Sequence, residues 1–259
     1  MRLDKYLADA NLGTRSELKK IIRNGKVSVD GIAVLDPAFQ IKPDQTVQLE
    51  GQIIAPGKPL YYMFHKPAGC VCATRDREKT VLDYFPPGER EKLFPVGRLD
   101  KDTEGLLLLT DDGAFAHRII SPKKHIPKLY YFEGKGCFDA DCVEQIANGM
   151  DIGDETMTLP AEIAYFLKGK EEQLLGNYPK TAAGQIMQRQ SVVYDDYDTR
   201  GILQITEGRY HQVKRMLKKG GVTDIYLRRL SIGSLYLDDA LAKGTYRALT
   251  PEEMKMLGV

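Results

Sequence analysis

Several features that define common protein classes are missing from this sequence of 259 residues. No apolar run approaches the roughly 20 residues that a membrane-spanning helix needs. The first ten residues, MRLDKYLADA, contain acids and no apolar core, unlike a secretory signal. Neither G-x-G-x-x-G nor G-x-x-x-x-G-K followed by Ser or Thr occurs, so the glycine-rich signatures of nucleotide binding are absent. We therefore expect a cytoplasmic protein with no membrane contact and no nucleotide cofactor.

Cysteine and histidine are also scarce, with four of each. Cys70, Cys72, Cys137 and Cys142 do not form paired C-x-x-C motifs, and the histidines are scattered without the spacing of metal ligands. In a reducing cytoplasm the cysteines are expected to be buried, reduced side chains. The sequence thus suggests neither a metal site nor any other cofactor.

The overall charge excludes little, because the net charge is only +1. Hydrophobic residues make up 42% and charged residues 28%, as in an ordinary globular protein, and the length allows a small domain joined to a larger one. The distribution is more informative. Residues 1–26 carry seven basic side chains against three acids. A local basic surface of this kind favours a polyanionic partner.

This basic N-terminal segment has the pattern of two short helices. Leu3, Tyr6 and Leu7 follow helical spacing, and we expect Gly13 to close the first helix. Thr14 and Glu17 form a capping box that begins the second. Three basic residues then recur every fourth position on its solvent face, where an RNA backbone would relieve their mutual repulsion: Arg15, Lys19 and Arg23.

A hairpin is predicted after the second helix. Val27 and Val29 alternate with polar residues, Asp30-Gly31 is a strong turn signal, and alternation resumes at Ile32. The segments RLDKYLA at 2–8 and TRSELKKIIRNGKVSVDG at 14–31, with the apolar residues up to about Leu49, resemble the S4 RNA-binding domain, a small α-L unit. We therefore assign residues 1–50 to such a domain. Residues 51–59, GQIIAPGKP, are predicted to be a linker, and 60–259 a second, larger domain.

The segment GRLDKDTEGLLLLT at 97–110 is the most informative part of the larger domain. Its four leucines predict a strand buried on both faces, and a carboxylate at the start of such a strand is held rigidly. A calcium loop is an alternative, because acids from Asp100 to Asp111 fall near the required spacing. We reject it, since Phe94-Pro95-Val96-Gly97 cannot form the preceding helix and the twelfth position is not glutamate.

Three further segments of the larger domain carry chemistry-bearing residues. Lys66 lies in the turn HKPAG at 65–69, after a strand predicted from Tyr61 to Phe64, and Val71 to Thr74 is expected to be extended. A helix is expected over 114–120, capped by an acid. The segment 122–131 sets basic residues beside Tyr130 and Tyr131, which suits phosphate contact and base stacking.

The segment 202–221, ILQITEGRYHQVKRMLKKGG, predicts a strand, a turn at Glu207-Gly208 and a helix. The core face of this helix carries Val213, Met216 and Leu217. The basic residues Arg209, His211, Lys214 and Arg215 near its N-terminus oppose the helix dipole and so indicate a nearby anion. Lys214 lies at the edge of the apolar face, where it can reach a carboxylate, whereas Arg215 points outward toward phosphate.

Together these segments resemble the pseudouridine synthases of the RsuA branch, through HKPAG at 65–69, VGRLDKDTEGLLLLTDDG at 96–113, PKLYY at 127–131 and EGRYHQVKRML at 207–217. The resemblance implies an α+β fold, in which the S4-like domain precedes a catalytic domain with a mixed, mainly antiparallel sheet. It also implies that Asp100 is the catalytic aspartate, that Tyr130 stacks on the target base and that Lys214 is the basic partner of Asp100. Asp102 and Glu104 are then structural or RNA-facing.

The expected RNA contacts are Arg98, which would help to hold the strand open, together with Arg15, Lys19, Arg23, Lys66, Arg209, His211 and Arg215. The resemblance further implies that a flipped uridine of ribosomal RNA is isomerised without metal or cofactor, most closely as in the enzymes for 16S rRNA. Whether Asp100 acts as a nucleophile or assists elimination stays open. The chain is expected to act as a monomer. Residues 166–192 match no motif of the family and are assigned no role.

Three alternatives remain. The chain could be a pseudouridine synthase for 23S rRNA or tRNA, or a non-catalytic RNA-binding or ribosome-assembly factor that contains an S4 domain. Metal-dependent hydrolysis by the acidic cluster is the third, and it predicts inhibition by a chelator.

Overall fold

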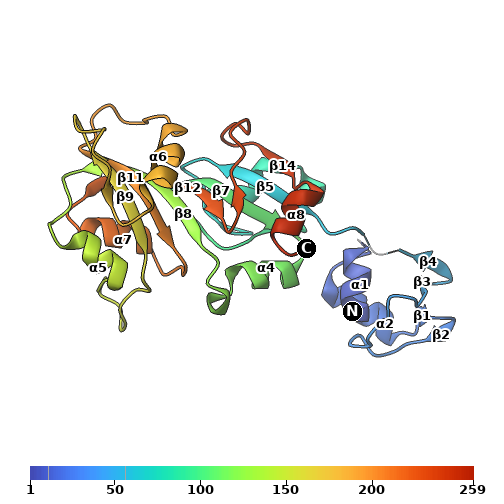
Figure 1. Cartoon of the computed structure of the whole chain (residues 1–259). Helices are drawn as coiled ribbons and strands as arrows, with labels where there is room; N and C mark the ends of the chain where they lie inside the picture. The colour runs from blue at the N-terminus through green and yellow to red at the C-terminus, as the bar shows by residue number, and fades with distance from the viewer. Residues whose placement is uncertain (11, 56) are drawn as a thin grey trace. The chain divides into compact units, whose positions relative to one another are not determined.

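The computed structural model describes residues 1–10, 12–55 and 57–259, which divide into two units, Met1–Pro59 and Leu60–Val259 (Figure 1). In the first unit, helices α1 (Leu3–Asp9) and α2 (Arg15–Arg23) pack on a sheet of order β2-β1-β3-β4. The strands are β1 (Val27–Val29), β2 (Ile32–Ala33), β3 (Val47–Leu49) and β4 (Gln52–Ile54). The predicted capping box is confirmed, because the Thr14 hydroxyl accepts from the Glu17 amide and the Thr14 amide donates to the Glu17 carboxylate at 2.8 Å.

Two boundaries of this unit differ from the prediction. Helix α1 ends at Asp9 rather than at Gly13. The predicted linker begins with a strand, since β4 pairs antiparallel with β3 through a turn at Glu50 and Gly51, where φ is 49° and 82°. Such a turn needs positive φ at both central residues, and a Glu-Gly pair signals it less clearly than Asp-Gly does. Pro56, also within the predicted linker, lies outside the described residues.

The second unit is built around one mixed sheet of order β10-β9-β11-β8-β12-β7-β5-β14, to which β13 and β6 attach. Its pairings are antiparallel except that β12 runs parallel to β7. The strands are β5 (Tyr61–Lys66), β6 (Phe94–Pro95), β7 (Glu104–Thr110), β8 (Lys128–Lys135), β9 (Glu162–Leu167), β10 (Leu175–Gly176), β11 (Thr199–Ile205), β12 (Thr223–Ile232), β13 (Leu235–Tyr236) and β14 (Tyr246–Ala248). This arrangement confirms the predicted α+β class.

Helices cover both faces of this sheet (Figure 1). On one face, Leu107 and Leu109 belong to a core cluster that also includes residues of α5 and α7, and on the other, Leu106 and Leu108 share a cluster with residues of α4. The prediction of a leucine strand buried on both faces is therefore confirmed. The helices of this unit are η1 (Val81–Tyr84), α3 (Pro87–Arg90), α4 (Gly113–Ile120), η2 (Pro122–Lys124), α5 (Cys142–Asn148), α6 (Lys180–Gln188), α7 (Gln212–Lys219) and α8 (Pro251–Met256).

Two segments of the second unit depart from the sequence analysis. Residues 71–74 form no strand, and only Val71 makes an isolated bridge, to Thr80. Residues 166–192 are more ordered than their polar composition suggests, because they include β10 and α6, whose Ala183 and Met187 are buried against the sheet. Over the described ranges, no helix is long and apolar enough to span a bilayer.

Candidate active site

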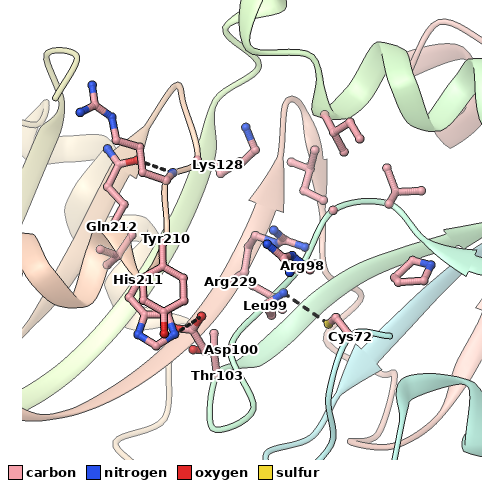
Figure 2. Close-up of a pocket in the computed structure, with 18 of the residues that line it drawn as sticks. Cys72, Arg98, Leu99, Asp100, Thr103, Lys128, Tyr210, His211, Gln212 and Arg229 are labelled. Atoms are coloured by element: carbon pink, nitrogen blue, oxygen red, sulfur yellow. Dashed lines mark hydrogen bonds and ion pairs between the residues drawn. The ribbon is translucent and has the colours of Figure 1, made fainter. Parts of the chain in front are cut away.

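A cleft of about 830 Å³ opens on the second unit (Figure 2). It lies on the face of the sheet that carries Tyr130. Its walls come from segments far apart in the sequence: the loop before β7, strands β8 and β12, and the start of α7. Asp100, Tyr130, His211 and Lys214 all line it. The sheet therefore brings together the three residues expected to be catalytic.

Asp100 lies in the loop between β6 and β7. Hydrogen bonds from Lys66 hold this loop in place. The Lys66 side chain is fully buried, and its ammonium donates to the carbonyl oxygens of Pro67, Asp100, Lys101 and Thr103 at 2.9–3.2 Å. Burial lowers the pKa of Lys66 below its ordinary value. The prediction that Lys66 contacts RNA is therefore wrong, because its buried ammonium already donates to backbone carbonyls.

The carboxylate of Asp100 faces two basic side chains from the start of α7. His211 Nε2 lies 3.3 Å from Asp100 Oδ1 (Figure 2), and Lys214 Nζ lies 3.4 Å from Oδ2. The side chain of Asp100 is 24% exposed, so it is reachable from the cleft yet partly desolvated. The predicted contact between Lys214 and Asp100 is present.

His211, expected among the RNA contacts, is instead directed at Asp100. Its backbone is left-handed, with φ of 49°, which is uncommon for a residue with a Cβ. Its ring stacks on that of Tyr210, with centroids 3.9 Å apart and planes at 15°. Tyr210 itself is 74% exposed at the cleft. The stack and the backbone geometry together fix the imidazole beside the carboxylate.

Asp102 also contributes to the site, because the Lys214 ammonium forms a second, closer ion pair with it. Burial raises the pKa of Asp102, but the hydrogen bond and charge of Lys214 outweigh burial and leave this pKa below its ordinary value. Lys214 is thus held between two carboxylates. Glu104, by contrast, is buried away from them and accepts hydrogen bonds from Tyr226 and Lys243 at 2.6 and 2.7 Å. Its position is structural.

Tyr130 lies on β8 with 7% of its surface exposed, in the core cluster that forms the floor of the cleft. It pairs in register with Leu203 of β11 and with Arg229 of β12. The backbone that carries the ring is thus held on two sides by the sheet. A rigid ring at the bottom of a cleft is suited to stacking against a planar base.

Arg209 and Arg215, predicted to meet RNA phosphates, are engaged within the protein. Arg209 donates to the carbonyls of Thr156 and Met157 at 2.6 Å, and Arg215 donates to those of Ile152 and Tyr210. Both guanidinium groups also pair with Asp154. They hold residues 152–157 against the start of α7, so both guanidinium groups have partners within the protein, and an RNA contact by either residue stays a prediction.

The remaining predicted RNA contacts lie at exposed positions. Arg98 is exposed at the cleft. In the first unit Arg15 and Arg23 are exposed on α2, while Lys19 is half-buried there. Across the described ranges none of these four forms a salt bridge. Their charges are therefore available to a polyanion.

Two cations of the cleft carried little or no signal in the sequence. Lys128 stood out only as one member of a basic segment, and Arg229 was missed because it lies in the apolar run of β12. A charge within an apolar strand was the one available signal. The described residues hold no group of three or more His, Cys, Asp and Glu side chains that could bind a metal ion.

Comparison with known proteins identifies both units. Residues 60–219 match the family described as RNA pseudouridylate synthase, and residues 1–47 match the S4 domain. The chain is 41% identical over 260 residues to an uncharacterized RNA pseudouridine synthase of Bacillus subtilis, covering 99% of this chain and 98% of that protein. It is 36% identical over 256 residues to the ribosomal small subunit pseudouridine synthase A of Vibrio cholerae, covering 98% of each. A crystal structure of a pseudouridylate synthase matches with a TM-score of 0.61 and 34% identity over 99% of both chains.

Proposed function

The chain belongs to the RNA pseudouridylate synthase family, and we propose that it isomerises a specific uridine of small-subunit (16S) ribosomal RNA to pseudouridine. Relatives named for the small ribosomal subunit, similar over almost their whole length, support this choice of RNA. The observation that carries the proposal is the carboxylate of Asp100, held at the cleft by Lys214 and His211 on the same face as Tyr130.

The reaction breaks the bond between ribose C1′ and uracil N1, turns the base and joins C1′ to C5. The proton leaves C5 and a proton is gained at N1, so no atom is added or removed. Asp100 fits two roles: attack as a nucleophile, or assistance to glycosidic cleavage and proton removal. Both roles use the carboxylate oxygens of Asp100, and the ammonium of Lys214 lies beside one of them.

The target base must first leave its stack, at a cost of a few kcal/mol. Stacking on Tyr130 would offset ~1–3 kcal/mol of this cost. Tyr130 is suited to that role because the sheet fixes its ring before the base arrives. Since an isomerisation consumes no second substrate, the proposal includes no cofactor. It further assigns the chain to the cytoplasm as a monomer whose S4 unit binds the RNA.

The first test replaces Asp100. We expect Asp100→Asn to form no detectable pseudouridine while binding RNA as the wild type does, because the amide keeps the shape but cannot act as nucleophile or base. Asp102→Asn, the matched control, should lose activity only in part, since Lys214 then pairs with Asp100 alone. Pseudouridine is measured by carbodiimide labelling and primer extension on rRNA.

Turnover by Asp100→Asn would overturn the catalytic assignment. The choice of RNA is tested separately, by mapping pseudouridines in a deletion strain. Loss of a site in 16S rRNA supports the proposal, whereas loss of a site in 23S rRNA or tRNA redirects it. Full rescue of a deletion phenotype by Asp100→Asn would favour a non-catalytic assembly factor.

A further inference from the structure

Arg229 lies on β12, the strand between the Asp100 side and the Tyr130 side of the cleft. Strand β12 runs between β7 and β8, and Arg229 pairs in register with Gly105 on one side and Tyr130 on the other. Its side chain lines the cleft (Figure 2), as do Asp100 and Tyr130. A nucleotide engaged by both Asp100 and Tyr130 must therefore lie over Arg229.

The guanidinium of Arg229 lacks an anionic partner. The residue is 3% exposed, and its Nε donates to the carbonyl oxygen of Leu106 at 2.8 Å. Its Nη2 is buried and has no hydrogen-bond partner among the described residues. Burying an unpaired cation costs free energy, so proteins retain such a group mainly where a ligand completes it.

A second cation, Lys128 of β8, lies near Arg229. Burial, and to a smaller extent the charge of Arg229, lowers the pKa of Lys128 to about 8, and the charge of Glu207 opposes this shift. Glu207 does not neutralise Lys128, because its oxygens already accept from Leu159, Arg209 and Gln212. Among the residues that the structure describes, the ammonium donates only to the carbonyl of Ile126, at 3.0 Å. Two repelling cations thus face one cleft without a carboxylate between them.

We propose that Arg229 and Lys128 form a phosphate-binding subsite, which holds a phosphodiester of the RNA strand next to the flipped uridine. An anion between the two cations relieves their repulsion and supplies the acceptor that Nη2 lacks. Uracil is uncharged and has Tyr130 for its face, so the two charges match the backbone better than the base. Arg98, also on the cleft, extends the basic surface toward solvent.

The subsite makes Arg229 a positioning residue. A phosphate held beside Tyr130 fixes the attached ribose relative to Asp100, which lies on the other side of β12. The inference rests on the proposed function in that it takes RNA as the ligand. It does not depend on which RNA is modified.

Binding of a short fluorescent oligouridylate to the full chain tests the subsite. For wild type, Arg229→Gln and Lys128→Met, log Kd is followed as the salt concentration rises from about 50 to 200 mM. Each lost phosphate contact should reduce the salt slope by about 0.7. Arg228→Gln is the matched control. Arg228 precedes Arg229 in β12 and its replacement removes the same charge, but its side chain lies over the rings of Tyr131 and Tyr226 on the opposite face. An unchanged slope in Arg229→Gln would overturn the proposal.

A second arm identifies the group that is bound. Neutral methylphosphonates replace the linkages of the oligonucleotide one at a time. One linkage should weaken binding to the wild type but leave Arg229→Gln unaffected. The proposal fails if each methylphosphonate weakens binding to both proteins equally, and removal of one base weakens binding to the wild type but not to Arg229→Gln. Arg229 would then contact the base. Thermal unfolding checks that each variant is folded.

The pH dependence gives a third readout. Below pH 8 Lys128 is protonated and ready to bind phosphate, whereas above this value a proton must be taken up on binding. Affinity should therefore fall as pH rises from about 7 to 9, by at most about tenfold per unit. In Lys128→Met this dependence should vanish, and its persistence would contradict the role of Lys128. All three readouts measure binding, so they stand or fall independently of pseudouridine formation.

Discussion

The ammonium group of Lys66 has no access to solvent and donates to four carbonyl oxygens, two of which belong to Asp100 and Lys101. The charge acts on the backbone of the loop rather than on a substrate. Sequence alone could not separate these uses, because a lysine in a turn next to a catalytic segment fits either. The distinction depends on how β5 lies against β7, which pairs Lys66 with Gly105.

At this scale we expect Lys66→Met to destabilise the protein by at least about 2 kcal/mol, since it leaves buried acceptors without a charged donor. Pseudouridine formation should fall as well, because the loop that carries Asp100 loses its anchor. Lys101→Met is the control: Lys101 pairs with Glu78 at the surface, where such pairs contribute little. Chemical denaturation measures the difference, and equal stability of the two variants would contradict the anchoring role.

Among the site residues, those with a local signal were found and those without one were missed. Periodicity places Lys214 at the apolar edge of a helix, where it can meet a carboxylate, and the family resemblance implies that this carboxylate is Asp100. His211 was expected to face RNA, since nothing in the sequence reveals its left-handed backbone or its stack on Tyr210. Arg229 gave no signal of function, because its role depends on which strands flank β12.

Strands β7 and β12 approach unusually closely at Gly105. Its φ is 103°, and a Cβ there would lie 2.2 Å from the carbonyl oxygen of Arg229. Only glycine adopts this positive φ without strain and also leaves room for the carbonyl oxygen. The close contact fixes Arg229 against the strand that follows Asp100, so the two halves of the cleft are held at one point.

We predict that Gly105→Ala destabilises the fold more than backbone strain alone, which costs about 1–3 kcal/mol. Gly169→Ala supplies the reference, because Gly169 also has positive φ, 77°, but faces open space. Activity of Gly105→Ala should drop even where the protein remains folded, as β12 shifts. Thermal unfolding and single-turnover assays measure both effects; comparable losses in the two variants would argue against a tight β7–β12 contact.

The elements that the sequence predicted well are those with one dominant pattern. The strand β7, the helix α7 and the hairpin at Asp30-Gly31 each have clear periodicity or turn chemistry. Strand β4 and helix α6 were not predicted, because short or polar segments of this kind are ordered by what they pack against. Tertiary contacts thus decided where local signals were weak.

For the whole molecule, the proposed function assigns RNA binding to the first unit and chemistry to the second. Neutralising Arg15, Lys19 and Arg23 to Gln should weaken RNA binding and reduce the salt slope by up to about 2, at roughly 0.7 per lost contact. Conversion of bound RNA under single-turnover conditions should not change, because Asp100 lies in the other unit. Neutralising Lys26, Lys42 and Lys58 provides the same charge loss elsewhere in the first unit. Equal effects of the two triple variants would mean that α2 is not the binding face.

The parallel pairing of β7 with β12 joins residues 104–105 to 228–229, more than a hundred positions later in the chain. A chain leaving the ribosome completes its first unit early, whereas the cleft cannot assemble until β12 has emerged. A nascent chain can therefore display its basic helix to RNA long before it can isomerise a base. During synthesis the first unit is thus complete before the cleft of the second unit forms.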